Sequence, residues 1–133
     1  MPAMSTAPQP SFLEFLPDDV VIMRTWAGDG EDIAVTAERL KKRAEQGRFF
    51  LIVDFSGVTG GIDSATRERG SNLIKAEWMR ACVYINASMP MRAALKVINL
   101  AMFLAGRADF PTEFVKSMEE AQEAVARLKA AGN

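Results

Sequence analysis

Two long apolar runs limit the folds that this chain can adopt. Residues 49–55 read FFLIVDF, with Asp54 as the only charged side chain. A strand with one face in water alternates apolar and polar residues, whereas a run without alternation is typical of a strand buried on both faces. Residues 79–87 (MRACVYINA) form a second run of this kind. We therefore expect two buried strands, the first of them central in a parallel sheet.

The rest of the chain alternates strands and helices around these runs. Further strands are expected at residues 12–16, 20–27 and 114–115, and a turn at residues 17–19 (PDD) joins the first two. Helices are expected from the glycine break at residues 28–30 to about residue 46, at about 64–77, at 91–104 and after Ser117. The pattern predicts an α/β fold: a mixed, mainly parallel sheet of about five strands with about four helices, in which the first strand or two run antiparallel.

Local signals support the first and last helices. Ser117 and Glu120 form a capping box, in which each side chain satisfies a free backbone donor at the start of the last helix. In the first expected helix, the charged side chains within residues 38–45 are expected to form a solvated face. The inward faces of the two helices are expected to consist of Ile33, Ala37, Leu40 and Ala44, and of Ala121, Ala124, Val125 and Leu128.

Length and composition favour one small cytoplasmic domain. The 133 residues suffice for a single domain, expected at residues 11–131, and residues 1–10 are expected to be a disordered leader. Sixteen basic against seventeen acidic residues give a net charge of -1, so a nucleic-acid partner is not expected. The start of the chain lacks the basic and apolar regions of a signal peptide, and no stretch has the length of a transmembrane segment.

The residue types available leave little for catalysis. The chain has no histidine, which removes histidine-based triads, histidine general bases and histidine-ligated zinc. A single cysteine, Cys82, excludes an intrachain disulfide and a multi-cysteine metal site. An enzyme would need Asp54, Asp63 or a lysine as its base. We expect a protein that binds or signals, with no catalytic residues, no metal and no cofactor.

Polar side chains follow the two buried strands. In open parallel sheets, sites collect beyond the carboxyl ends of the strands. Asp63 stands at the start of an expected helix, where it caps the helix or, with its neighbours, forms a phosphorylation switch; both readings stay open. The polar residues at this edge are Asp54, Ser56, Thr59, Asp63, Ser64, Thr66, Asn86 and Ser88.

The first of these loops resembles a known family. Residues 54–59 (DFSGVT), followed by Asp63-Ser64, look like the D-x-S-x-V-x…D-S-S-G signature of STAS domains, the anti-sigma-factor antagonists of the SpoIIAA type and their relatives. The order of elements is similar over residues 12–130. The sequence is more similar still to the SpoIIAA-like (STAS/Sec14-like) branch of small bacterial proteins. That branch has a tryptophan and a glycine ending an early strand (here Trp26 and Gly28), an apolar third helix and an ending like residues 114–121 (FVKSMEEA).

The resemblance implies a STAS fold and a regulatory, protein-binding role. In the antagonists the second serine of D-S-S-G accepts a phosphate, and this chain has Ala65 there, so Ser64 or Thr66 would have to take its place. The partner-binding or switch loop that the resemblance implies contains Asp54, Ser56, Thr59, Asp63, Ser64, Thr66 and Arg67.

The helix expected at residues 91–104 (MRAALKVINLAMFL) has too much apolar surface for one sheet. Its polar residues Arg92, Lys96 and Asn99 form one narrow stripe. Three things could cover the excess: the rest of the fold, a second copy in a homodimer, or a lipid-like ligand or membrane surface. The residues expected to form the apolar ligand or dimer surface are Met91, Leu95, Ile98, Met102 and Phe103. A binder of an apolar small molecule is thus the alternative to a protein-interaction module.

Overall fold

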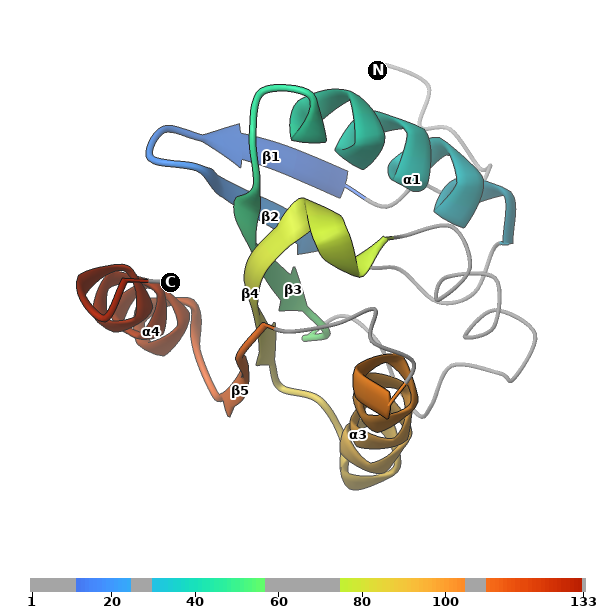
Figure 1. Ribbon diagram of the computed structural model, residues 1–133. Helices are drawn as coiled ribbons and strands as arrows, with labels where there is room; N and C mark the ends of the chain where they lie inside the picture. The colour runs from blue at the N-terminus through green and yellow to red at the C-terminus, as the bar shows by residue number, and fades with distance from the viewer. Residues whose placement is uncertain (1–11, 25–29, 57–74, 105–109, 133) are drawn as a thin grey trace, which may run out of the picture.

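The computed structural model describes residues 12–24, 30–56, 75–104 and 110–132, and shows an α/β fold (Figure 1). The strands are β1 (Phe12–Leu16), β2 (Val20–Arg24), β3 (Phe49–Asp54), β4 (Met79–Ile85) and β5 (Thr112–Val115). The helices are α1 (Gly30–Ala44), the 3-10 turn η1 (Ala76–Trp78), α3 (Met89–Leu104) and α4 (Met118–Ala130). Within these ranges, no helix has both the length and the apolar character needed to cross a bilayer.

The five strands form one sheet in the order β1-β2-β3-β4-β5. β1 pairs with β2 antiparallel, and every other neighbouring pair is parallel. The mixed, mainly parallel sheet predicted from the sequence is confirmed, including its antiparallel first strand. Three α-helices are described; most of the helix expected at residues 64–77 lies outside the described residues, and its last three residues are η1.

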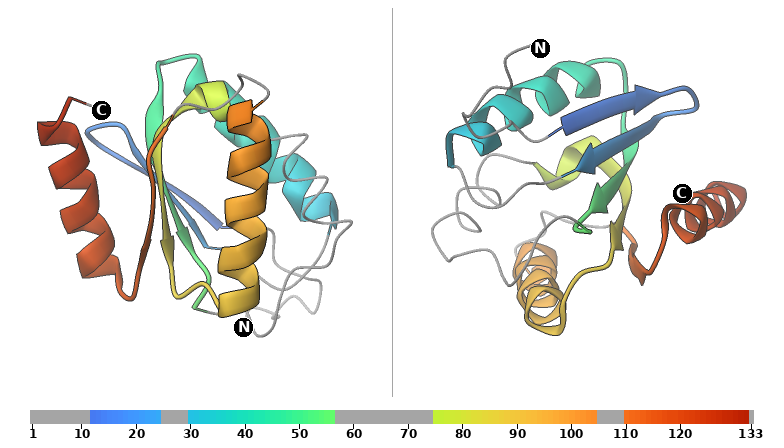
Figure 2. Two further views of the ribbon diagram at one scale, coloured as in Figure 1. Left: turned by 60° about the horizontal axis from the view of Figure 1, so that its bottom comes forward. Right: turned by 180° about the vertical axis from the view of Figure 1, so that it is seen from behind.

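Helices cover both faces of the sheet, with α4 on one side and α1 and α3 on the other (Figure 2). The side chains of β3 alternate between the two layers: Phe49, Leu51 and Val53 belong to the cluster that includes residues of α1 and α3, whereas Phe50 and Ile52 pack with α4. The first five residues of β3 are all buried, as the apolar run predicts.

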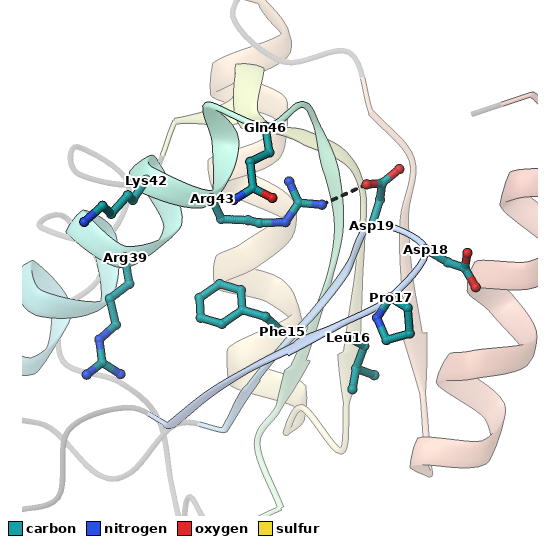
Figure 3. Close-up of a pocket in the computed structure, with 9 residues that line it drawn as sticks. All are labelled: Phe15, Leu16, Pro17, Asp18, Asp19, Arg39, Lys42, Arg43 and Gln46. Carbon is teal, nitrogen blue, oxygen red and sulfur yellow. Dashed lines mark hydrogen bonds and ion pairs between the residues drawn. The ribbon is translucent and has the colours of Figure 1, made fainter.

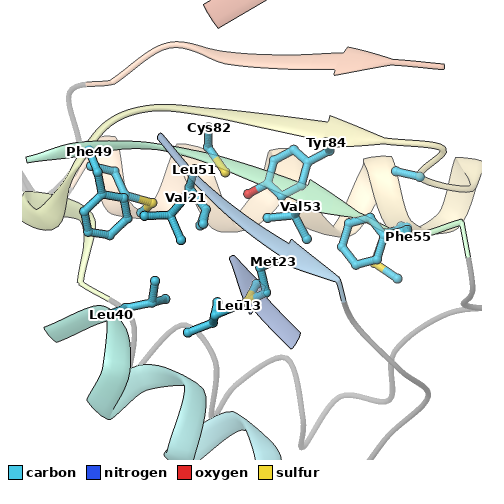
Figure 4. Packing of buried hydrophobic residues seen from close by; sticks show 13 residues of the cluster. Leu13, Val21, Met23, Leu40, Phe49, Leu51, Val53, Phe55, Cys82 and Tyr84 are labelled. Atoms are coloured by element: carbon cyan, nitrogen blue, oxygen red, sulfur yellow. The ribbon is translucent and has the colours of Figure 1, made fainter. Parts of the chain in front are cut away.

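Three stacked aromatic rings lie on the α1/α3 side of the core. Tyr84 lies between Phe55 and Phe114, with ring centroids 5.9 and 5.5 Å away (Figure 4 shows Phe55 and Tyr84). Beside it, burial raises the pKa of the Cys82 thiol to about 12, while its hydrogen bond with Tyr84 acts in the opposite direction. Burial also raises the pKa of the Tyr84 hydroxyl. Both groups are therefore neutral within the folded core.

The start of α4 follows the predicted capping box in part. Ser117 is the N-cap, and its hydroxyl oxygen accepts a hydrogen bond from the Glu120 backbone at 3.1 Å. The predicted inward residues of α4 are all buried. Farther along, Arg127 donates two hydrogen bonds of 2.8 Å to the Glu113 carboxylate, which tie α4 to β5 and lower the pKa of Glu113.

Three element boundaries differ from the sequence-based expectations. β4 ends at Ile85 because Asn86 adopts a left-handed φ of 55°, which turns the chain out of the sheet. α3 then begins at Met89, two residues early, because the Ser88 hydroxyl accepts a hydrogen bond from the Met91 backbone at 3.3 Å. β5 begins at Thr112, which pairs with Cys82 of β4. The part of the second expected strand beyond Arg24 lies outside the described residues.

The burial of Cys82 makes a direct prediction. A thiol with a pKa of about 12 instead of its ordinary 9.0 has about a thousandfold less thiolate at pH 8. We expect a disulfide reagent such as DTNB to react with Cys82 of the native protein at least that much more slowly than in 6 M guanidinium. Equal rates in the two conditions would contradict the buried position.

The N-cap makes a second prediction. Replacing Ser117 by alanine removes the acceptor for the Glu120 backbone, and should lower the free energy of unfolding by about 1 kcal/mol. Ser117→Asp keeps an acceptor at the same place and should retain most of the stability. Urea unfolding of the three proteins tests this, and the capping role fails if the alanine and aspartate variants lose the same amount.

Candidate functional site

The carboxyl ends of β3 and β4 bring three predicted site residues together. Asp54 is the last residue of β3, and its Oδ1 accepts a hydrogen bond of 2.9 Å from the Ser56 backbone. Asn86 follows β4, and its side-chain amide donates to the Ser56 hydroxyl at 2.8 Å. Ser56 therefore connects the ends of the two central strands. We call Asp54, Ser56 and Asn86 the carboxyl-end cluster.

Backbone hydrogen bonds hold this edge in place. The Phe55 amide donates to the Ile85 carbonyl, and the Asn86 amide donates to the Val115 carbonyl, both at 3.0 Å. These bonds extend the pairing of three strands by one residue beyond their regular ends. Ser56 and Asn86 are exposed and Asp54 is partly buried, so the cluster is a polar surface held by hydrogen bonds.

Ser88, the other polar residue expected after β4, serves the start of α3. Its hydroxyl accepts from the Met91 backbone, and the Arg92 Nε donates to the Ala87 carbonyl at 3.2 Å. These contacts fix the direction in which α3 leaves the sheet. The remaining residues of the predicted switch loop lie outside the described residues: Thr59, Asp63, Ser64, Thr66 and Arg67.

The apolar stripe of α3 that was expected to contact a ligand or a second copy points inward where its side chains are described. Met91 is only 3% exposed and belongs to the core, and Leu95 packs against the same cluster. The side chains of Ile98, Met102 and Phe103 lie outside the described part of the structure. Met91 and Leu95 thus contribute to the α1/α3 side of the core.

A different apolar stripe of α3 is exposed. Val97, Leu100 and Leu104 are 67, 58 and 75% exposed, and Met89 in the first turn is 74% exposed. Their spacing of eight, three and four residues places them along one side of the helix. The stripe is about 22 Å long, at 1.5 Å per residue. It begins three residues after Asn86, so it adjoins the carboxyl-end cluster.

The polar residues of α3 lie against β5. Asn99 donates to the Thr112 hydroxyl at 2.9 Å, and the charged ends of Arg92 and Lys96 are 5.5 and 5.8 Å from the ring centroid of Phe114. The expected narrow polar stripe therefore covers the edge of the sheet, which leaves the second apolar stripe facing outward.

The sequence predicts the excess of apolar surface on α3 but not which side of the helix is exposed. The spacing of Met89, Val97, Leu100 and Leu104 is a helical repeat that could have been found. The sequence does not single it out, because the stripe through Met91 is also apolar and has helical spacing. Only the packing of the helix on the sheet distinguishes the two.

The described residues offer few groups for chemistry at this edge. The Cys82 thiol is buried among the core strands and does not reach the carboxyl-end cluster surface. In the described ranges, no three of the cysteine, aspartate and glutamate side chains gather closely enough to hold a metal ion. The described residues thus place the hydrogen-bonding surface of the carboxyl-end cluster beside the exposed apolar stripe of α3.

Comparisons with known proteins add no assignment to this geometry. No protein-family model matches the sequence, and a search of curated proteins found no similar one. The function of this chain is therefore inferred from its residues and their arrangement.

Proposed function

We propose that this chain is a non-catalytic regulatory or protein-interaction module of the STAS/SpoIIAA-like type. The mixed five-strand sheet with its antiparallel first strand supports the proposal, since it agrees with the order of elements that the resemblance implies. The D-x-S-x-V motif supports it as well, because Asp54 and Ser56 make the hydrogen bonds that shape the edge of the sheet.

The observation that carries the proposal is the exposed stripe of α3 beside the carboxyl-end cluster. Large exposed apolar side chains in a row are typical of an interaction surface, whereas single ones are normal on any protein. The cluster supplies fixed donors and acceptors at one end of that row. Protein interfaces combine an apolar centre with such a polar rim.

The proposed partner is a protein with an apolar patch that matches the α3 stripe. In this proposal, Asn86 and Ser56 provide the polar contacts at the rim, and Val97 and Leu100 provide the apolar centre. Control by phosphorylation would act through Ser64 or Thr66, since Ala65 occupies the phosphoacceptor position of the family.

A second candidate function uses the same stripe. A lipid-like molecule or a membrane surface would also cover Val97, Leu100 and Leu104, and Lys96 next to them would favour an anionic headgroup. A second copy of this chain is a third possible occupant. The measurements below distinguish these from a separate protein partner.

We expect Val97→Ser/Leu100→Ser to reduce retention of the partner by tagged protein about tenfold, because two central apolar contacts are lost. Val35→Ser is the matched control, since Val35 is 48% exposed on α1, away from the stripe. The wild type, the double variant (the stripe variant) and Val35→Ser serve as three tagged baits. Quantitative mass spectrometry of the proteins that each bait retains provides the measurement. The urea midpoints of the baits should agree, since all three positions are exposed.

The other occupants give different results. A dimer in light scattering that only the stripe variant dissociates would assign the surface to a second copy. Lipid that co-purifies with the wild type and Val35→Ser, but not with the stripe variant, would support the alternative. The interaction surface is wrong if the stripe variant and the control behave alike in all three measurements.

A further inference from the structure

A pocket of about 600 Å³ lies at the opposite end of the sheet, between the β1–β2 turn and the last turns of α1 (Figure 3). One wall is α1, with Arg39, Lys42 and Arg43, and the other is the turn that contains Pro17. Phe15 lies between the two walls. The volume is in the range of sites for small molecules.

The wall on α1 is a regular feature of the helix. Arg39, Lys42 and Arg43 occupy positions i, i+3 and i+4, so they share one side of α1. Leu40 and Thr36 lie on the inner side and are buried. Part of the charged face of α1 that was expected to be solvated therefore lines the pocket.

An ion pair fixes the distance between the walls. Arg43 donates to Asp19 Oδ1 at 2.8 Å and to the Gly47 carbonyl at 3.2 Å, and its side chain is only 12% exposed. Arg80 lies 3.5 Å from the other Asp19 oxygen. The two arginines compensate the charge of Asp19, and they hold the turn against the end of α1.

Two positive charges remain available to a ligand. Arg39 and Lys42 form no ion pair with any residue that the structure describes. Asp18 lines the pocket, but its carboxylate points away from both of them (Figure 3). The carboxyl end of α1 contributes a negative partial charge of only about one half. Among the residues that line the pocket, Arg39, Lys42 and Arg43 exceed Asp18 and Asp19 by one positive charge, so the lining favours an anion.

Phe15 adds an apolar surface to the charged lining of the pocket. It is 47% exposed at the end of β1, with its ring beside the Arg39 wall. A flat apolar body can lie against the ring while its charged group reaches the two cations. Neither feature alone would select such a molecule.

We propose that this pocket binds an aromatic carboxylate. Phe15 and Pro17 contact the aromatic body, and Arg39 and Lys42 bind the carboxylate. The site is separate from the α3 stripe, so it does not depend on the function proposed above.

Titration of ¹⁵N-labelled protein with 2-naphthoate tests the proposal. We expect shift changes at backbone amides of residues 15–19 and 39–46, and weaker binding as salt increases. The neutral analogue 2-naphthylmethanol should bind at least about threefold more weakly, because it lacks the charge that the two cations attract.

Matched variants identify the cations. Lys42→Gln should weaken 2-naphthoate about threefold to fivefold, whereas Lys41→Gln, with the same charge change on the other side of α1, should leave the affinity unchanged. Phe15→Ala should weaken both ligands. Unchanged spectra outside the substituted positions show that the variants fold.

Three results would overturn the proposal. The first is equal affinity of wild type and Lys42→Gln for 2-naphthoate, and the second is equal affinity of the wild type for the two ligands. The third is shift changes confined to α3, which would place the ligand on the exposed apolar stripe.

Discussion

The double-sided burial of β3 determines the layout of this protein. Phe49, Leu51 and Val53 fill one layer, Phe50 and Ile52 fill the other, and β2 and β4 pair with both edges of the strand. No side of β3 remains for a ligand, so the strand reaches the surface only at its two ends. The carboxyl-end cluster, the exposed stripe of α3 and the pocket beside α1 lie at those ends, or on helices that begin or finish there.

Much of the fold follows from the sequence, because burial on both sides leaves an unmistakable pattern. The run at residues 49–55 predicted the central strand, and Ser117 predicted the start of α4. The boundaries were less predictable where a single side chain decides them. The left-handed Asn86 ends β4, and Ser88 starts α3 early; neither effect has a periodic signature.

The candidate surfaces were harder to predict than the fold. Polar residues at the carboxyl ends of the strands were recognised, since topology alone brings Ser56 and Asn86 together. On α3, two stripes consist of apolar residues at helical spacing, so the sequence alone does not indicate which of them packs in the core. In the folded protein Arg92 and Lys96 contact Phe114 of β5, Met91 is buried in the core and Val97 is exposed. That contact joins residues about twenty positions apart, so no local pattern reports it.

The two ends of the sheet also differ in their electrostatics, although the net charge of -1 suggests a uniform surface. At the carboxyl end, Asp54 pairs in register with Arg24 of β2, and Arg24 forms an ion pair of 2.9 Å with Glu14. At the other end, Arg43 and Arg80 share Asp19. Because Asp19 is already compensated, Arg39 and Lys42 give the lining of the pocket a net positive charge. A balanced composition therefore permits the charged groups at one end to pair with one another while the other end favours anions, since charge acts over about 10 Å and not over the whole molecule.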